Sequence, residues 1–204
     1  MEKRLIIIGK GGQGRVIHDI AVKLGYKNIF FLDDKPSDDE NHIGKVSDAE
    51  LYIKDSEFIV GIGDSAIRKK IFHFIDNLGA KIISLIHPSA VIGENVTIGR
   101  GVAIMAGAVV NCGSEIHDGA IINTCASVDH DCVVGKFSHV SVGAHLAGTV
   151  LLGEEVYIWS GAIISNNINI SDGVIVGAGA VVIRHINKKG VYVGVPARKT
   201  IRQL

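Results

Sequence analysis

The chain has 204 residues, 47% of them hydrophobic but only 5% aromatic, and its 21 Lys and Arg residues balance 21 Asp and Glu residues. A net charge of zero does not favour nucleic acid as a partner, and no apolar run approaches the roughly 18 residues of a membrane span. Residues 1–14 lack the pattern of a signal peptide, and three cysteines without CxxC spacing indicate a reducing, cytoplasmic setting.

The first 86 residues predict a small Rossmann-like α/β domain. Apolar strands are expected at 4–9, 28–34, 57–64 and 80–86, with helices between them at about 15–24 and 65–78. Strands that alternate with helices indicate a parallel sheet. The acidic segment 35–55 predicts a solvated loop with a short helix.

A glycine-rich loop, "GKGGQG" at residues 9–14, lies between the first expected strand and helix. Such a loop lets a phosphate approach backbone N–H groups at a helix N-terminus. Asp33 and Asp34 end the next strand, where an acidic side chain can contact a ribose. The competing interpretations are a packing turn without a ligand and a nicotinamide dinucleotide site, for which the domain is short because two mononucleotide-binding halves are normally needed.

A six-residue repeat occupies most of the remaining chain, 87–204, and His87-Pro88 opens it with an extended connection. Every sixth residue from Ile92 to Val182 is Ile, Val or Leu, sixteen positions in all, and residues two places earlier are small or β-branched. Two inward positions per six residues correspond to one short strand and one tight turn. This period predicts a β-helix in which three strands form a triangular coil of about 18 residues.

Two histidines lie in the segment "VDHDCVVGKFSHVSVG" at residues 128–143. In the hexad register His139 precedes an inward position and is expected to face outward on a strand, whereas His130 is expected at a corner. Neither is predicted to be a core residue. They are half a coil apart, so a neighbouring subunit in a trimer is better placed than one chain to bring both to one ligand. Outward apolar side chains, Val133, Val142 and Trp159, support that trimer.

The tail after residue 183 carries basic residues and no acidic ones, which predicts either a solvated end or a basic patch for a polyphosphate ligand. The hexads followed by "GVYVGVPARK" resemble the hexapeptide-repeat acyltransferases, which form left-handed β-helices and trimers. With "FLDD", "GIGDSAIRKK" and "NTCASVDHDCVVGKFSHVSVGAHLAG", the whole chain resembles the sugar O- and N-acyltransferases of the sialic-acid and bacillosamine pathways, and most closely the UDP-4-amino-sugar N-acetyltransferases.

The resemblance implies a role for individual residues. His130 would be the general base and Asp131 would increase its basicity, although Asp131 is shorter than the Glu of the bacillosamine enzymes, which predicts a looser or water-mediated contact. Acetyl-CoA as co-substrate would contact His139 and the backbone near Gly148, Ser160 and Ala178, and no metal is implied. The UDP-sugar would be held by Gly11, Gly12, Gln13, Asp33, Asp34 and Gly63, with Gln13 in place of the His of the bacillosamine enzymes.

Three alternatives remain open at this level. The first is O-acetylation of sialic acid or another sugar hydroxyl, which needs the same base. The second is a β-helix zinc hydratase, which uses three histidines across a trimer interface, here His117, His139 and His145, although no acidic partners for these histidines are evident. The third is a nucleotide-sugar sensor without catalytic activity, against which the His130–Asp131 pair and the basic tail both argue.

Overall fold

The computed structural model describes residues 4–200. Its N-terminal part is a five-stranded parallel sheet of order β3-β2-β1-β4-β5. The strands are β1 (Arg4–Ile8), β2 (Asn28–Leu32), β3 (His42–Gly44), β4 (Ser56–Val60) and β5 (Lys81–Ile82). Helix α1 (Gly12–Lys23) follows β1, the 3-10 segment η1 (Val46–Asp55) follows β3, and α2 (Ser65–Asn77) follows β4. The predicted strand–helix alternation is confirmed.

Strand β1 is the centre of this sheet because its apolar run fills both faces. Leu5 and Ile7 pack with Ile17 of α1, while Ile6 and Ile8 pack on the other side with Phe72 of α2. All six side chains are at most 2% exposed. A strand buried on both faces reads as a continuous apolar run, which is why "RLIII" shows no alternation.

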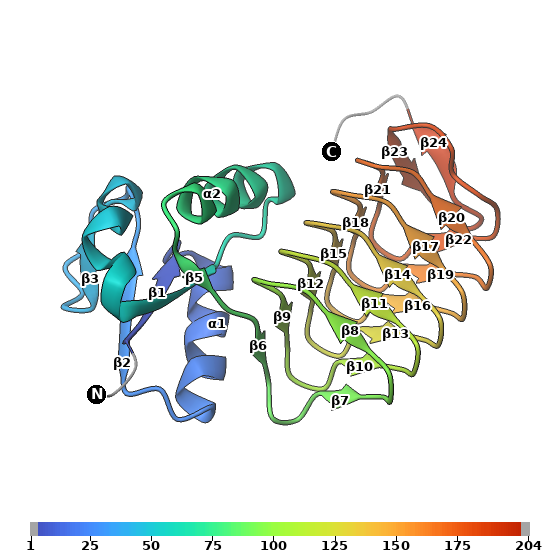
Figure 1. Cartoon of the computed structure of the whole chain (residues 1–204). Coiled ribbons are helices and arrows are strands. Elements are labelled where there is room, and N and C mark those ends of the chain that lie inside the picture. The colour runs from blue at the N-terminus through green and yellow to red at the C-terminus, as the bar shows by residue number, and fades with distance from the viewer. Residues whose placement is uncertain (1–3, 201–204) are drawn as a thin grey trace.

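The rest of the chain is a left-handed parallel β-helix of two-residue strands, seen as a stack of coils in Figure 1. The first face contains β7 (Val91–Ile92), β10 (Val109–Val110), β13 (Ser127–Val128), β16 (His145–Leu146), β19 (Ile163–Ile164) and β22 (Val181–Val182). The second face contains β8 (Thr97–Ile98), β11 (Glu115–Ile116), β14 (Val133–Val134), β17 (Leu151–Leu152) and β20 (Asn169–Ile170). The third face contains β6 (Leu85–Ile86), β9 (Ala103–Ile104), β12 (Ile121–Ile122), β15 (His139–Val140), β18 (Tyr157–Ile158) and β21 (Ile175–Val176), extended by the antiparallel hairpin β23 (Val191–Val193) and β24 (Arg198–Thr200).

The interior of the rod is the aliphatic ladder that the hexads predict. Val110 pairs with Val128 and Val128 with Leu146, each one coil apart, and all three are at most 1% exposed. Stacked strands exchange backbone hydrogen bonds along the whole rod, for example from the Asn111 N–H to the Val128 carbonyl at 2.9 Å. The six-residue period and its inward register are therefore confirmed.

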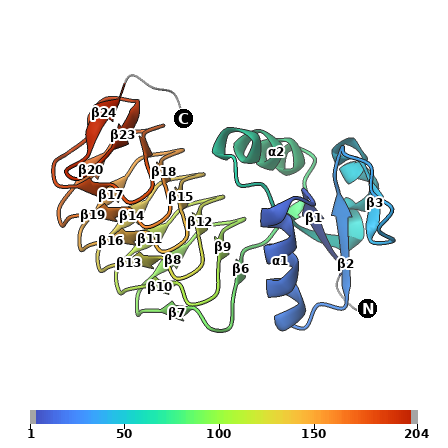
Figure 2. The same cartoon turned by 180° about the vertical axis from the view of Figure 1, so that it is seen from behind.

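The third face of the rod packs against the α/β domain, as Figures 1 and 2 show from opposite sides. Met105 and Ile121 of this face share one core with Leu5 and Ile17. The segment 80–86, predicted as one strand, is divided: β5 completes the first sheet, and β6 begins the third face by pairing with β9. The connection runs through Ser84, whose hydroxyl donates to the Gly99 carbonyl at 2.6 Å. No helix within residues 4–200 is long and apolar enough to cross a membrane.

Candidate functional site

The glycine loop between β1 and α1 forms one wall of a pocket of about 640 Å³. Gly14 packs so closely on the Gly9 carbonyl oxygen that a Cβ atom there would overlap it, and Gly9 has a left-handed φ of 99°. Helix α1 begins after Gly11, which supplies no capping side chain. The first N–H groups of α1 have no intrahelical acceptor, so this end of the helix suits an anion.

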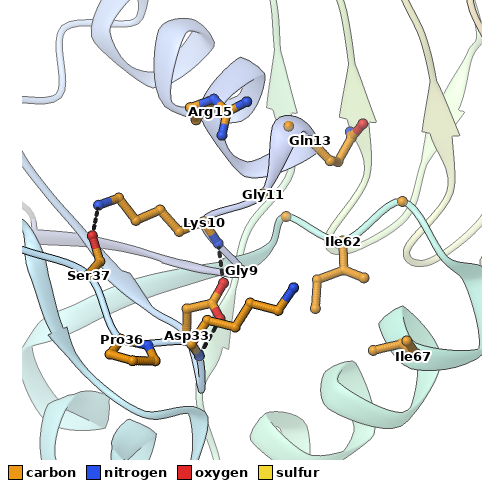
Figure 3. Close-up of a pocket in the computed structure, with 14 residues that line it drawn as sticks. Gly9, Lys10, Gly11, Gln13, Arg15, Asp33, Pro36, Ser37, Ile62 and Ile67 are labelled. Atoms are coloured by element: carbon orange, nitrogen blue, oxygen red, sulfur yellow. Dashed lines mark hydrogen bonds between the residues drawn. The ribbon is translucent and has the colours of Figure 1, made fainter. Parts of the chain in front are cut away.

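Cations surround this pocket, with Lys10, Arg15 and Lys35 all on its lining. Figure 3 shows the Lys10 side chain reaching Ser37, where Nζ lies 2.5 Å from the hydroxyl, and the Lys10 backbone N–H donating to Asp33 at 2.7 Å. Partial burial alone would raise the pKa of Asp33, but the N–H groups of Lys10 and Lys35 hold that pKa below its usual value. The pocket therefore offers one fixed carboxylate beside three cationic side chains, of which Lys10 is already paired with Asp39 at 2.8 Å. This combination suits a phosphorylated ribose.

Most residues predicted to bind the nucleotide line this pocket together: Gly11, Gly12, Gln13, Asp33 and Gly63. Asp34 instead lines a neighbouring pocket of about 670 Å³, which Asp33 also borders, and its carboxylate accepts the Val46 N–H at 3.1 Å. In Figure 3 Gln13 points away from Lys10 and Asp33. Its amide nitrogen is shielded from solvent and has no hydrogen-bond partner within the described chain.

The pocket residues Lys10, Arg15 and Ser37 were not predicted from the sequence. Lys10 and Arg15 lie within or directly after the glycine loop, so the run "GKGGQGR" held a signal for them. Ser37 belongs to a loop whose path the sequence does not indicate.

His130 lies at the corner where the chain passes from β13 on the first face to β14 on the second face. Asp131 has a left-handed φ of 56°, and this turn brings its Oδ2 to 2.8 Å from Nδ1 of His130. The expected loose or water-mediated contact is thus wrong, because the turn compensates for the shorter side chain. The His130 N–H also donates to Asp129, at 2.8 Å.

The electrostatics of this corner suit a base. The hydrogen bond to Asp131, followed by the nearby charge of Asp129, raises the pKa of His130 above its ordinary value of 6.5. The His130 side chain is 50% exposed. With Nδ1 donating to Asp131, Nε2 presents a lone pair, and no hydrogen bond to it is formed within residues 4–200. Gly148, one coil further on, lies directly beside this nitrogen.

His139 lies on the third face, outside the aliphatic ladder, but it is only 3% exposed. The prediction that it is not a core residue is wrong, because the α/β domain covers this face. Asn123 donates to its Nε2 at 3.0 Å, its Nδ1 lies 3.4 Å from the Gly63 carbonyl, and its ring packs on Tyr157 at 4.5 Å. Burial, and then the charge of Arg68, lowers the pKa of His139 to about 3, so it is neutral. Its contact with acetyl-CoA stays a prediction.

The predicted site residues are distributed around the rod. His130, Asp131 and Gly148 share the corner between the first and second faces. Ser160 and Ala178 lie at the corner between the third and first faces, and the Gly179 N–H donates to the Ser160 carbonyl at 3.0 Å. The nucleotide pocket belongs to the α/β domain, and Gly63 of its lining contacts His139 on the third face, which is opposite the His130 corner in the triangular coil. A single chain therefore does not bring the histidine base and the nucleotide pocket together.

The histidines considered as zinc ligands are also separated. His117 follows β11 of the second face and contacts Glu115, His145 lies on the first face and contacts Ser127, and His139 lies on the third face. Across residues 4–200, no three His, Cys, Asp or Glu side chains gather as metal ligands. One chain therefore does not bring these three histidines together.

Known proteins resemble both halves of the chain. Residues 4–75 match the family described as the PglD N-terminal domain. The acetyltransferase domain of PglB from Neisseria gonorrhoeae is 39% identical over 97% of this chain and 100% of that chain, with a TM-score of 0.94, and a second structure of that domain contains acetyl coenzyme A. PerB from Caulobacter crescentus, in complex with CoA and GDP-perosamine, is 34% identical over 98% of each chain, with a TM-score of 0.93.

Proposed function

The chain belongs to the hexapeptide-repeat sugar N-acetyltransferases, and from that premise we propose that it acetylates the 4-amino group of a UDP-linked sugar with His130 as general base. Acetyl-CoA is the acyl donor of this family's reaction. The observation that carries the proposal is the direct 2.8 Å contact between His130 and Asp131 with Nε2 left accessible. An acceptor assay tests the preference for UDP, and substitution of His130 tests its role as the base.

The chemistry requires a group that takes one proton. The substrate amine forms a bond to the thioester carbonyl carbon, the carbonyl electrons move to oxygen, and Nε2 of His130 accepts the proton that the amine nitrogen loses. The C–S bond then breaks as the carbonyl re-forms, and the proton passes to the departing sulfur. Asp131 keeps the Nδ1–H tautomer in place and stabilises the imidazolium that forms between these steps.

The nucleotide pocket supports the substrate class. Lys10, Arg15 and Lys35 and the N-terminus of α1 fit a diphosphate, and Asp33 fits a ribose hydroxyl. PerB was solved with a GDP-linked amino sugar, so relatives of this fold accept nucleotide amino sugars. The coenzyme is assigned to the edges with Gly148, Ser160 and Ala178, and a pocket of about 240 Å³ lined by Arg184, Arg198 and Lys199 fits its phosphates.

A homotrimer completes this site. The His130 corner and the nucleotide pocket lie on opposite sides of one rod, so a second copy must supply one of them. The rod also exposes apolar side chains suited to such contacts: Val142 is 48% exposed and Trp159 39%. Sedimentation of the active protein tests this arrangement, and a fully active monomer would contradict it.

The decisive experiment incubates the protein with acetyl-CoA and one acceptor at a time, and measures free thiol release and product mass. The acceptors are UDP-4-amino sugars, GDP-4-amino sugars and free sialic acid. The proposal expects acetylated amine with the UDP-linked acceptors. Preference for the GDP sugars would overturn the nucleotide assignment, while turnover of sialic acid alone would favour the O-acetylation alternative. Nucleotide-sugar binding without thiol release from any acceptor would favour the sensor.

A further inference from the structure

One cation of the chain is almost completely buried where the two domains meet. Arg68, in α2, is 1% exposed, although it stands in the run "RKK" with Lys69 and Lys70. Burial lowers the pKa of Arg68 to about 10, which leaves it charged at neutral pH. A buried cation is expensive to desolvate, so the groups that surround it deserve an explanation.

Carbonyl oxygens rather than carboxylates satisfy Arg68. Its Nη1 donates to Ile62 at 2.9 Å and to Gly63 at 2.8 Å, its Nε donates to Gly119 at 2.7 Å, and its Nη2 donates to Phe137 at 2.5 Å. No carboxylate lies within ion-pair distance of it in the described part of the chain. We call Arg68 and the four residues whose carbonyl groups it contacts the Arg68 clasp.

The four carbonyl acceptors come from both domains, and a fifth, longer contact runs to the Ser65 hydroxyl at 3.4 Å. Ile62 and Gly63 belong to the loop between β4 and α2, and both line the nucleotide pocket. Gly119 and Phe137 lie in adjacent coils at the corner of the rod between its second and third faces. The planar guanidinium, with donors in fixed directions, thus holds one wall of the pocket against the rod.

A second contact holds the same loop from the side of the rod. Nδ1 of His139 lies 3.4 Å from the Gly63 carbonyl oxygen, the oxygen that Arg68 also contacts, and Asn123 fixes the other side of the imidazole at 3.0 Å. The Phe137 ring packs on Phe72 of α2, with ring centres 5.3 Å apart. These contacts therefore fix the 62–63 loop, one wall of the pocket, in place against the coils.

We propose that Arg68 is a positioning residue that sets where the bound nucleotide sugar presents its amine relative to the acetyl-transfer machinery on the rods. The inference rests on the proposed function, because it concerns the same reaction. Loss of the clasp frees the wall at Gly63 without removing a group that touches either substrate. Because reaction rates fall steeply when bound groups are misplaced by about 1 Å, the transfer step is expected to suffer more than binding.

Arg68→Lys and Arg68→Met test the proposal, with Lys69→Met as the matched control. Lys69 is the next residue of α2 and also reaches the rod, at 2.6 Å from Glu155 and 6.0 Å from the centre of the Phe137 ring, but it does not contact the 62–63 loop. The readouts are hydrogen exchange in the 61–65 segment, calorimetric binding of UDP and of acetyl-CoA, and the single-turnover rate at saturating substrates. Arg68→Met removes the guanidinium donor from four carbonyl groups, although the Gly63 carbonyl keeps its contact with His139. This loss can unfold the chain, so Arg68→Lys is the decisive variant.

For Arg68→Lys we expect faster exchange in 61–65, acetyl-CoA affinity within about twofold of the unsubstituted protein, and a transfer rate reduced roughly 10- to 100-fold. Lys69→Met should leave both the exchange and the rate nearly unchanged. An unchanged saturating rate in Arg68→Lys, or an equal loss in Lys69→Met, would overturn the clasp. If the unsubstituted protein acetylates no nucleotide amino sugar, the proposed function fails, and the exchange measurement still shows whether Arg68 holds the loop.

Discussion

His130 lies over Gly148 so closely that a Cβ atom built at Gly148 would be 2.5 Å from His130 Nε2. Gly148 has no left-handed φ, so alanine fits its backbone, and the three atoms nearest to a Cβ there all belong to the imidazole of His130. We therefore expect Gly148→Ala to displace the imidazole and lower kcat roughly 10- to 100-fold, with a small change in Tm because an exposed side chain can move aside. Steady-state kinetics and thermal unfolding of the same preparation check this, and unchanged kcat would show that this packing does not orient the base.

His130→Ala should lower kcat by about 100- to 10,000-fold, the usual range for loss of a general base. The KM for acetyl-CoA should change little, because His130 is assigned to proton transfer, and stability should hold because His130 lies outside the ladder. Steady-state kinetics with each substrate varied in turn separates these effects. A variant that is fully active at neutral pH would reject His130 as the base.

Asp131→Asn should shift the pH dependence of kcat/KM to lower pH. His130 must be neutral to accept a proton, so kcat/KM should rise as pH increases through the His130 pKa, which Asp131 holds above 6.5. An amide removes the negative charge that favours imidazolium, so the acidic limb should shift to lower pH. Profiles from pH 5 to 9 check the shift against Glu115→Gln, a carboxylate that contacts His117 instead. The assignment is wrong if both variants keep the original limb.

His139 should make the protein less stable in acid. Its folded pKa of about 3 lies below the ordinary 6.5, so the unfolded chain binds the proton more readily. The contribution of neutral, buried His139 to the free energy of unfolding is complete above pH 6.5. Below pH 6.5 it falls by about 1.4 kcal/mol per pH unit in each protomer. Urea unfolding at pH 7.5, 6.5 and 5.5 measures this slope. His139→Gln should flatten it, and an equal slope in that variant would place the titrating group elsewhere.

Substitution of the two adjacent aspartates should affect the binding of the two substrates differently. Asp33→Ala combined with Asp34→Ala should weaken binding of UDP-sugars and leave acetyl-CoA affinity nearly intact, because both acids lie in the α/β domain. Of the single variants, Asp33→Ala should cost more, since Asp33 lines the glycine-loop pocket and accepts the Lys10 N–H. Calorimetry with each ligand checks the order. Equal loss of both ligands, in a variant with normal Tm, would contradict the pocket assignment.

The hexad pattern predicted the rod because each coil is specified by its own residues. Each coil repeats the same inward register, so Val128 and Val140 could be placed in the ladder without knowledge of any distant contact, and both are fully buried. The Gly-rich loop and Asp33 were likewise found from a strand, a turn and a helix in sequence order. The His130–Asp131 contact depended on a turn conformation that residue types alone did not indicate.

Contacts between the domains could not be predicted in this way. The register separates inward from outward positions, but it does not tell which outward face is covered, so His139 was expected at the surface. Arg68 is one of three consecutive cations, and only docking of α2 on the rod distinguishes it from Lys69 and Lys70. The division of 80–86 has the same origin, because β5 and β6 differ only in the partner strand that each one meets.

The corner that carries Asp131 has the same backbone in successive coils. Gly113, Asp131, Thr149 and Asn167 follow one another at this place, with φ values of 71°, 56°, 57° and 59°. The chain thus makes an identical turn whether the residue is glycine, carboxylate, hydroxyl or amide. The turn that brings Asp131 onto His130 is therefore already present in the coils directly above and below it, so evolution or design could place a histidine and its carboxylate there by substitution, without a new loop.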